Sequence, residues 1–88
     1  MARFMVTRTL PPLTEDELTE VGKRVVEVCN EMDGVEWLGS HLTADGKHSF
    51  CKFEAPDAES VREHARRSGL PVDDVFPLGG DIGPSMFK

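Results

Sequence analysis

The stretch Val35–Ala55, VEWLGSHLTADGKHSFCKFEA, decides the fold of this chain. Two short runs with the character of β-strands, Val35–Thr43 and Lys47–Ala55, flank the triplet Ala44-Asp45-Gly46. An Asp-Gly pair between two such runs is a strong local signal for a β-hairpin. The sequence therefore predicts two antiparallel neighbouring strands at the centre of the chain.

On the N-terminal side of the hairpin the sequence predicts a strand and then a helix. The strand covers Phe4–Leu10 and ends at Pro11-Pro12, because proline cannot donate a hydrogen bond to a neighbouring strand. Thr14 is the predicted N-cap of the helix, with Glu17 at the spacing of a capping box, and Gly34 ends the helix. Apolar residues recur at helical spacing along it: Leu18, Val21, Val25, Val28, Cys29 and Met32.

On the C-terminal side the sequence predicts a second helix and a last short strand. Asp57 is the predicted N-cap of this helix, Gly69 ends it, and the strand follows at Asp74–Leu78. The residues at helical spacing that face inward are Val61, His64, Ala65 and Ser68. The full order is therefore β-α-β-β-α-β.

This order is that of the ferredoxin-like fold, an α+β architecture with two helices on one face of a four-stranded antiparallel sheet. A chain of 88 residues allows one small domain, which we assign to residues 1–78. Residues 79–88, GGDIGPSMFK, are predicted to form a flexible C-terminal arm. Met86 and Phe87 in this arm are candidates to dock on a partner subunit.

The second face of such a sheet has no helix to cover it. The strands carry more large apolar residues than two short helices can bury: Phe4, Val6, Trp37, Leu38, Leu42, Phe50 and Phe53. An apolar sheet face must pack against another surface. We therefore expect a homodimer whose sheets pack face to face as a dimeric α/β barrel.

Charge and hydropathy exclude several classes of partner. The net charge of −6 disfavours a nucleic-acid-binding protein, because phosphate neutralisation needs a basic face. No apolar run approaches the roughly 20 residues that span a bilayer. The N-terminal sequence lacks the order of a signal peptide, and two cysteines are too few for a disulfide framework. These features predict a cytoplasmic protein without a membrane or nucleic-acid partner.

His41 and Cys51 are the first candidate metal ligands, because they lie on the two neighbouring strands of the predicted hairpin. Imidazole and thiolate suit nickel, zinc or copper better than calcium or magnesium. A second copy of the chain could supply the remaining ligands of a divalent metal ion. The alternative is structural: His41 would be a surface or interface histidine and Cys51 a small buried apolar residue.

The register of the hairpin decides which of these side chains share a face of the sheet. A two-residue type I′ turn pairs Thr43 with His48, and then His41 and His48 share a face with Trp37, Phe50, Lys52 and Glu54. A three-residue loop with a bulge pairs Thr43 with Lys47, and then His41, Ser49 and Cys51 lie together beside Trp37 and Phe53. We favour the bulged loop, because Gly46 as its third residue supplies the positive φ that it needs.

His64 is a further candidate ligand, provided that Cys51 points toward the helices. The alternative is that His64 is a core histidine with satisfied hydrogen bonds, because it lies on the inward side of its helix. Cys29 follows the apolar stripe of the first helix and is predicted to be a core residue. No order of residues typical of nucleophilic catalysis stands out, so nothing in the sequence supports an enzyme.

Several short motifs occur together and in order: FMVTRT at 4–9, WLGS at 37–40, DGK at 45–47, CKFEAP at 51–56, REHA at 62–65 and GLP at 69–71. With them the chain resembles, over residues 3–78, a small bacterial family of ferredoxin-like proteins often labelled nickel-binding. The resemblance implies the ferredoxin-like fold, a homodimer and nickel binding in some members, without an established catalytic activity. Cys51 matches the cysteine of this family, and His64 matches a histidine common in its second helix.

The leading functional hypothesis is a cytoplasmic homodimer that binds nickel as a buffer or sensor, with Cys51, His41 and His64 as ligands. One rival is an enzyme or small-molecule binder of the dimeric α/β-barrel kind, with His48, Glu54 or His64 as acid–base groups. It would use a cavity between sheet and helices. Another rival is an interaction module that binds no metal.

Overall fold

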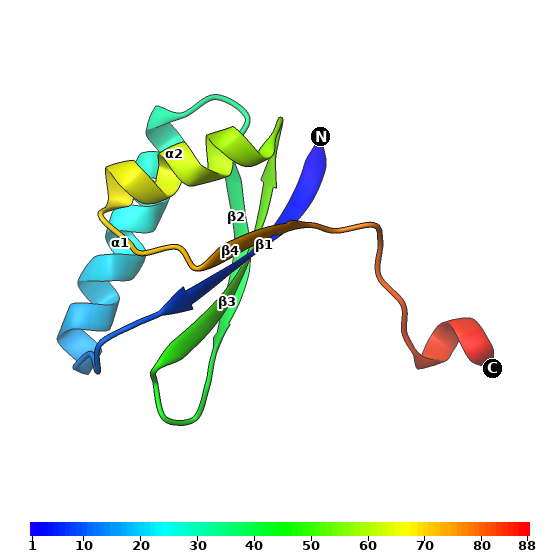
Figure 1. Ribbon diagram of the computed structural model, residues 1–88, viewed down its shortest axis with the longest axis horizontal. Helices are drawn as coiled ribbons and strands as arrows, with labels where there is room; N and C mark the ends of the chain where they lie inside the picture. The colour runs from blue at the N-terminus through cyan, green and yellow to red at the C-terminus, as the bar shows by residue number, and fades with distance from the viewer.

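Four strands form one antiparallel sheet in the order β2-β3-β1-β4, and this arrangement confirms the predicted α+β ferredoxin-like fold. The computed structural model describes all 88 residues. The elements are β1 (Ala2–Thr9), α1 (Glu15–Glu31), β2 (Glu36–Leu42), β3 (His48–Ala55), α2 (Ala58–Ser68), β4 (Asp74–Pro77) and a 3-10 helix, η1 (Pro84–Phe87). Figure 1 shows the two helices on the same side of the sheet.

Both helices begin at the residues that the sequence predicts. The hydroxyl of Thr14 accepts a hydrogen bond from the backbone N–H of Glu17 at 3.1 Å, and the Glu17 carboxylate accepts one from the N–H of Thr14 at 3.0 Å. This reciprocal pair satisfies two backbone donors at the start of α1. The Asp57 carboxylate caps α2 by accepting from the N–H of Ser60 at 2.8 Å, and Gly69 ends the helix in the left-handed region.

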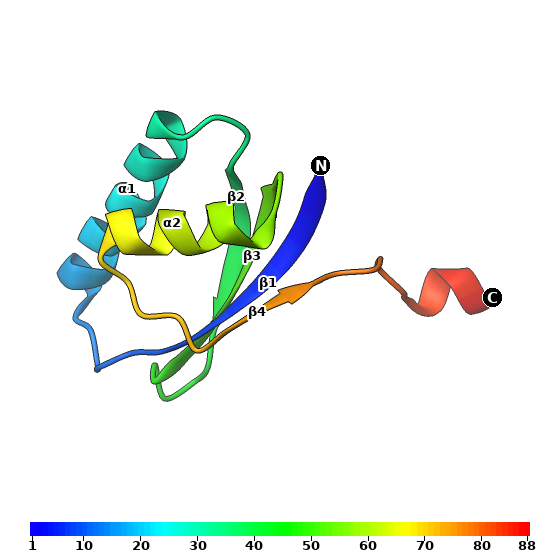
Figure 2. The same ribbon diagram turned by 45° about the horizontal axis from the view of Figure 1, so that its top comes forward.

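The covered face of the sheet contains the core, because alternate residues of β1 and β3 point toward the helices. Figure 2 shows α1 and α2 crossing over this face. In β1 the buried residues are Phe4, Val6 and Arg8, and in β3 they are Ser49, Cys51, Phe53 and Ala55. Val25, Val28 and Val61 bury the inner sides of the helices against them. We call the opposite side of the sheet the open face.

The turn of the hairpin differs from the bulged loop that we favoured. Residues 44–47 form a four-residue loop. Thr43 and His48, which flank the loop, pair with each other, and the Thr43 N–H donates to the His48 carbonyl at 3.0 Å. The Asp45 carboxylate organises this loop by accepting from the N–H of Lys47 at 2.9 Å and from the Thr43 hydroxyl at 2.7 Å. These hydrogen bonds, the one from Lys47 first, lower the pKa of Asp45. The predicted pairing of Thr43 with Lys47 is therefore wrong.

A bulge does occur in this hairpin, but at the far end of β2. Ser40 pairs with Cys51, while Trp37 pairs with Phe53, so the register shifts by one residue between Trp37 and Gly39. Gly39 adopts a φ of +145°, which residues with a side chain rarely adopt. As a result Trp37 and Ser40 both face the helices, and the Trp37 indole N–H donates to the Ser40 hydroxyl at 2.9 Å.

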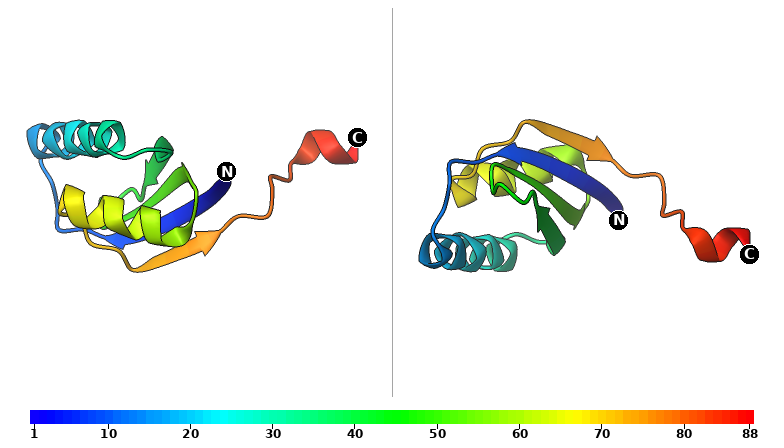
Figure 3. Two further views of the ribbon diagram at one scale, coloured as in Figure 1. Left: turned by 90° about the horizontal axis from the view of Figure 1, so that it is seen from above. Right: turned by 90° about the horizontal axis from the view of Figure 1, so that it is seen from below.

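Residues 79–88 extend away from the sheet and end in η1, as the two views of Figure 3 agree. Near the start of this segment the Asp81 carboxylate forms ion pairs with two residues of the open face, Lys52 (Nζ at 3.2 Å) and Arg3 (Nη1 at 3.6 Å). Met86 and Phe87 at its end are exposed. No helix in the chain is both long and apolar enough to cross a membrane.

Candidate functional site

His41 and His48 lie near each other on the open face of the sheet. His41 pairs with Phe50, and His48 precedes Phe50 by two residues on the same face of β3. Such diagonal neighbours on adjacent strands are about 7–8 Å apart, within reach of long side chains. The predicted bulged loop would have placed His41 beside Cys51 instead. The observed register therefore places His41 near a second imidazole, that of His48.

The imidazole nitrogens of both histidines are largely without partners in the chain. His48 Nδ1 lies 3.5 Å from the hydroxyl oxygen of Thr9, whose own proton goes to Asp73 at 2.6 Å. Neither Nε2 of His48 nor any ring nitrogen of His41 takes part in a hydrogen bond, and both residues are exposed. His48 Nε2 and the ring nitrogens of His41 can therefore bind a ligand without breaking an existing hydrogen bond.

Apolar side chains also lie on the open face. Phe50 of β3 is 41% exposed and Phe76 of β4 is 49% exposed. Met5 of β1 pairs with Phe76, so the apolar surface continues across the sheet. Around it stand Arg3, Lys52 and Glu54, with Arg3 and Glu54 in a 3.9 Å ion pair. An exposed surface of this mixed kind is typical of a contact between protein chains.

Cys51 lies on the other side of the sheet from His41. Its side chain is 8% exposed and its sulfur is 3.7 Å from the Ser49 hydroxyl, beneath the helices. Side chains alternate between the two faces of a strand, so Cys51 and its neighbour Phe50 point in opposite directions. Because His41 pairs with Phe50, the structure does not bring His41 and Cys51 together within one chain.

His64 is fully buried in the contact between α2, α1 and the sheet. Its Nε2–H points at the Val25 carbonyl at 3.0 Å, and Nδ1 can accept from the Ser68 hydroxyl at 3.4 Å. The ring packs against Phe53 with centroids 4.9 Å apart. Burial, with a smaller contribution from the charge of Arg8, lowers the pKa of His64. Both ring nitrogens thus have partners, as expected for a core histidine.

Cys29 approaches His64 across the two helices, a contact that sequence reasoning missed. The Cys29 sulfur is 3.3 Å from His64 Nε2. Burial raises the pKa of the Cys29 thiol and lowers that of His64, so both groups are neutral near pH 7. This pair is therefore a packing contact rather than the ion pair of a reactive cysteine. The signal in the sequence was the position of both residues on inward helix stripes.

The acid–base groups of the enzyme hypothesis do not converge. His48 and Glu54 lie on the open face of β3, six residues apart along the strand, which corresponds to about 20 Å. His64 is enclosed in the core on the opposite side of the sheet. No two of these three groups are placed to act on one bound molecule.

The structure allows a direct test of whether one chain can hold a metal ion. Nowhere in the chain do three or more His, Cys, Asp or Glu side chains gather closely enough. His41 and His48 supply a pair of imidazoles, a donor type that suits nickel. The donor set of one chain therefore fits only part of a nickel site.

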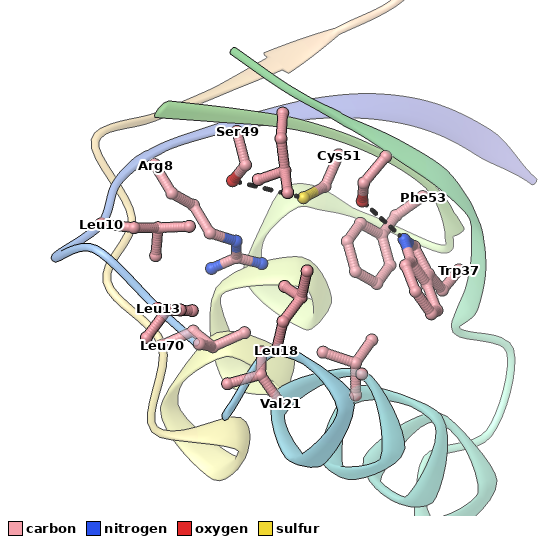
Figure 4. Close-up of a pocket in the computed structure, with 14 residues that line it drawn as sticks. Arg8, Leu10, Leu13, Leu18, Val21, Trp37, Ser49, Cys51, Phe53 and Leu70 are labelled. Carbon is pink, nitrogen blue, oxygen red and sulfur yellow. Dashed lines mark hydrogen bonds between the residues drawn. The ribbon is translucent and has the colours of Figure 1, made fainter. Parts of the chain in front are cut away.

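A cavity of about 260 Å³ opens between α1 and the covered face of the sheet. Figure 4 shows the side chains that line it, with the Arg8 guanidinium extending from β1 into the space. Cys51 and Ser49 form part of the sheet side of the wall, and Leu18 and Val21 form part of the α1 side. Sequence reasoning did not single out Arg8 as a binding residue, because nothing in the sequence shows that its charge is buried.

These features together define a small ferredoxin-like α+β protein with exposed imidazoles on its open sheet face and an apolar cavity on its covered side. The chain belongs to the family described as nickel responsive protein SCO4226-like, whose model matches residues 4–78. The crystal structure of SCO4226 from Streptomyces coelicolor A3(2) is similar to this chain, with a TM-score of 0.81. It is 21% identical, and the match covers 92% of this chain and 100% of that one, which shows the shared fold. No curated protein matches the sequence.

Proposed function

We propose that this protein is a cytoplasmic homodimer that binds nickel as a buffer or sensor and has no catalytic activity. The family to which the chain belongs is described as nickel responsive. The observation that carries the proposal is the pair of imidazoles, His41 and His48, on a sheet face that no helix covers. Zinc and copper are the competing ions, because imidazole binds them as well.

A second copy packed on the open face would complete both the fold and the site. It would cover Phe50 and Phe76, the two largest exposed apolar side chains of the sheet. Around a two-fold axis, each copy would contribute the same pair of histidines to the contact. Four imidazoles near one axis are a donor set that nickel accepts. The same association compensates for the thin core of an 88-residue chain.

Cys51 and His64 stay in the proposal as ligands of a separate site on the covered side of the sheet. The cavity wall exposes Cys51 to any ion that enters between α1 and the sheet. A thiolate ligand must first lose its proton, so nickel affinity at Cys51 would rise with pH. His64 would have to give up its hydrogen bond to Val25 or Ser68 to bind a metal ion. We therefore rank His41 first among the three ligands.

Calorimetric titration of untagged protein with nickel tests the proposal. We expect the wild type to bind nickel and His41→Ala to bind it at least about 10-fold more weakly, with a similar loss in His48→Ala. Lys47→Ala, next to His48 in the hairpin loop, is the matched control, because the exposed Lys47 side chain makes no hydrogen bond or ion pair, and this variant should bind as the wild type does. Zinc and copper titrations of the same proteins measure selectivity.

The variants at the covered side separate the two sites. A loss of nickel binding in Cys51→Ala or His64→Gln, with His41→Ala unchanged, would place nickel on the covered side of the sheet and overturn the open-face site. Unchanged binding in all four variants would reject every ligand named here. If the wild type gives no binding isotherm, the nickel-binding proposal is wrong.

A further inference from the structure

The cavity between α1 and the sheet has a mostly apolar wall that contains a single charged group. Of the residues that line it, ten are hydrophobic. They come from the segments after β1 and α2, from α1 and from the sheet, and include Leu10, Leu13, Leu18, Val21, Trp37 and Phe53. A volume of about 260 Å³ exceeds the roughly 150 Å³ that is sufficient for benzene in an apolar protein cavity. The space therefore suits a small organic molecule.

The charged group is the guanidinium of Arg8, which is 2% exposed. Its Nη1–H donates to the Pro71 carbonyl at 2.7 Å, while Nε has no hydrogen-bond partner at all. Nη2 takes part in none of the hydrogen bonds of the chain either. Nε and Nη2 lie on one edge of the guanidinium plane, the edge with which arginine binds both oxygens of a carboxylate. This edge is free and extends into the cavity (Figure 4).

No group of the protein neutralises the Arg8 charge. None of the ion pairs in the chain includes Arg8. The other polar residues of the cavity wall are Ser40 and Ser49, so the wall contains no carboxylate. Proteins rarely bury an unpaired charge, because removing it from water is costly unless an opposite charge replaces the water. A buried arginine with a free donor edge is therefore incomplete without an anion.

We propose that this cavity binds a monocarboxylate with an apolar body, whose carboxylate pairs with the Nε–Nη2 edge of Arg8. The apolar body then lies among the leucine, valine and aromatic side chains of the wall. A single carboxylate charge matches the single charge of Arg8, whereas a phosphate dianion would leave one charge buried without a partner. A molecule the size of octanoate or benzoate meets these requirements. The inference is independent of nickel binding, since it uses no residue of the open face.

The fluorescence of Trp37 can report ligand binding, because Trp37 lines the cavity and is the only tryptophan of the chain. Octanoate and benzoate are titrated into metal-free wild-type protein while the tryptophan fluorescence is followed. The uncharged analogues 1-octanol and benzyl alcohol measure what the apolar wall contributes alone. We expect saturable binding of the carboxylates that is about 10- to 100-fold tighter than binding of the alcohols, as for a charge-assisted hydrogen-bonded pair.

Arg8→Met keeps an apolar stem in place and removes the charge. In this variant we expect carboxylate affinity to fall to the level of the alcohols, while alcohol binding stays within about 3-fold of the wild type. Arg24→Met is the matched control, because Arg24 is an exposed arginine of α1 that does not line the cavity. It should bind carboxylates as the wild type does.

Gly22→Leu tests the same cavity without changing a charge. Gly22 lines the cavity from α1, and a Cβ there would meet nothing within 4 Å, so a larger side chain can enter the space. Leucine also favours helix over glycine, so the variant should fold. We expect it to lose carboxylate binding without a fall in its melting temperature. Equal affinity for octanoate and 1-octanol in the wild type, or no saturation by either carboxylate at about 10 mM, would overturn the proposal. So would unchanged carboxylate binding in both Arg8→Met and Gly22→Leu.

Discussion

The two faces of β3 carry opposite kinds of chemistry on one strand of eight residues. Toward the helices lie Ser49, Cys51, Phe53 and Ala55, all buried. Toward the open face lie His48 and Phe50, which are exposed, and Lys52 and Glu54, which are half-buried. The covered face presents side chains that the helices shield from water, whereas the open face presents imidazoles that water and ions can reach.

This difference separates two modes of binding in the same small domain. A ligand of the covered face must be largely apolar and must balance a buried charge with an opposite one, as the free edge of Arg8 requires. A ligand of the open face meets exposed polar and apolar side chains that no helix covers. Each face can therefore be disturbed without the other, and variants on the two sides should have separable effects.

The largest expected effect comes from the covered face. Phe53 is 1% exposed and packs against both His64 and the core valines. Phe53→Ala should lower the free energy of unfolding by about 3–5 kcal/mol, because it leaves a cavity in the core. Urea-induced unfolding followed by circular dichroism at several protein concentrations measures this loss. We expect the loss to be the same at every concentration.

Phe50→Ala is the matched variant on the other face of the same strand. Phe50 is 41% exposed, so its truncation should cost less than half as much as that of Phe53. The cost should also depend on protein concentration, because the truncation weakens the proposed packing of one chain on the other. Equal, concentration-independent losses in the two variants would show that the faces do not differ in this way.

A charge on the open face should have the next largest effect. In Phe50→Asp a carboxylate replaces an aromatic ring at the proposed contact between two chains. Burying that carboxylate without a partner should raise the dimer Kd by about 100-fold, equivalent to about 3 kcal/mol. Sedimentation velocity measures the shift from dimer to monomer, and Lys47→Asp in the hairpin loop is the control.

The monomeric form of Phe50→Asp should retain the fold of the wild type. Its far-ultraviolet circular dichroism and its binding of octanoate are expected to remain, because both depend on the covered face. A wild type that sediments as a monomer would remove the dimer and leave the open face without a second chain. A Phe50→Asp variant that unfolds would contradict the separation of the two faces.

The third prediction concerns the glycine that assigns residues of β2 to the two faces. The bulge at Gly39 directs Trp37 to the covered face, whereas strict alternation would place Trp37 beside His41. Gly39→Ala leaves enough space for the new Cβ but forces alanine to a φ of +145°, at a cost of about 1–3 kcal/mol. Thermal unfolding and the fluorescence of Trp37 measure the cost and any change of register. Gly22→Ala, in a helix without a positive φ, should instead stabilise by about 0.5–1 kcal/mol. If Gly39→Ala is as stable as the wild type, the bulge does not depend on glycine.

Local signals in the sequence were sufficient to predict most of the fold. Thr14 with Glu17, Asp57 with Gly69, and the Asp45-Gly46 pair each act within a few residues, and each lies where it was predicted. The register of the hairpin could not be predicted in the same way. It depends on the Asp45 carboxylate, which binds both Thr43 and Lys47 and so lengthens the loop by one residue.

The candidate sites were harder to predict than the fold, because they depend on which face each side chain occupies. A shift of one residue in register moved His41 away from Cys51 and next to His48. The burial of Arg8 depends on contacts with Pro71 and with α1, which are distant in the sequence. The pattern of His64 on its helix did favour a core position, and its hydrogen bonds to Val25 and Ser68 agree with that alternative.

The smallest predicted effect is a dependence of stability on pH that comes from the covered face alone. Burial lowers the pKa of His64 below its ordinary value of 6.5, so the unfolded chain takes up a proton at a higher pH than the folded one. The unfolded state then binds more protons, and the free energy of unfolding falls as the pH decreases below about 6.5. The slope from this one group cannot exceed about 1.4 kcal/mol per pH unit, and it ends at the folded-state pKa.

Urea unfolding between about pH 5 and pH 7, with EDTA present to remove metal ions, measures this slope. In His64→Gln the glutamine amide can still donate to the Val25 carbonyl but has no proton to gain, so the slope in this range should become smaller. A variant with the same slope as the wild type would show that the acid sensitivity arises elsewhere. The covered face would then no longer be the source of this pH dependence.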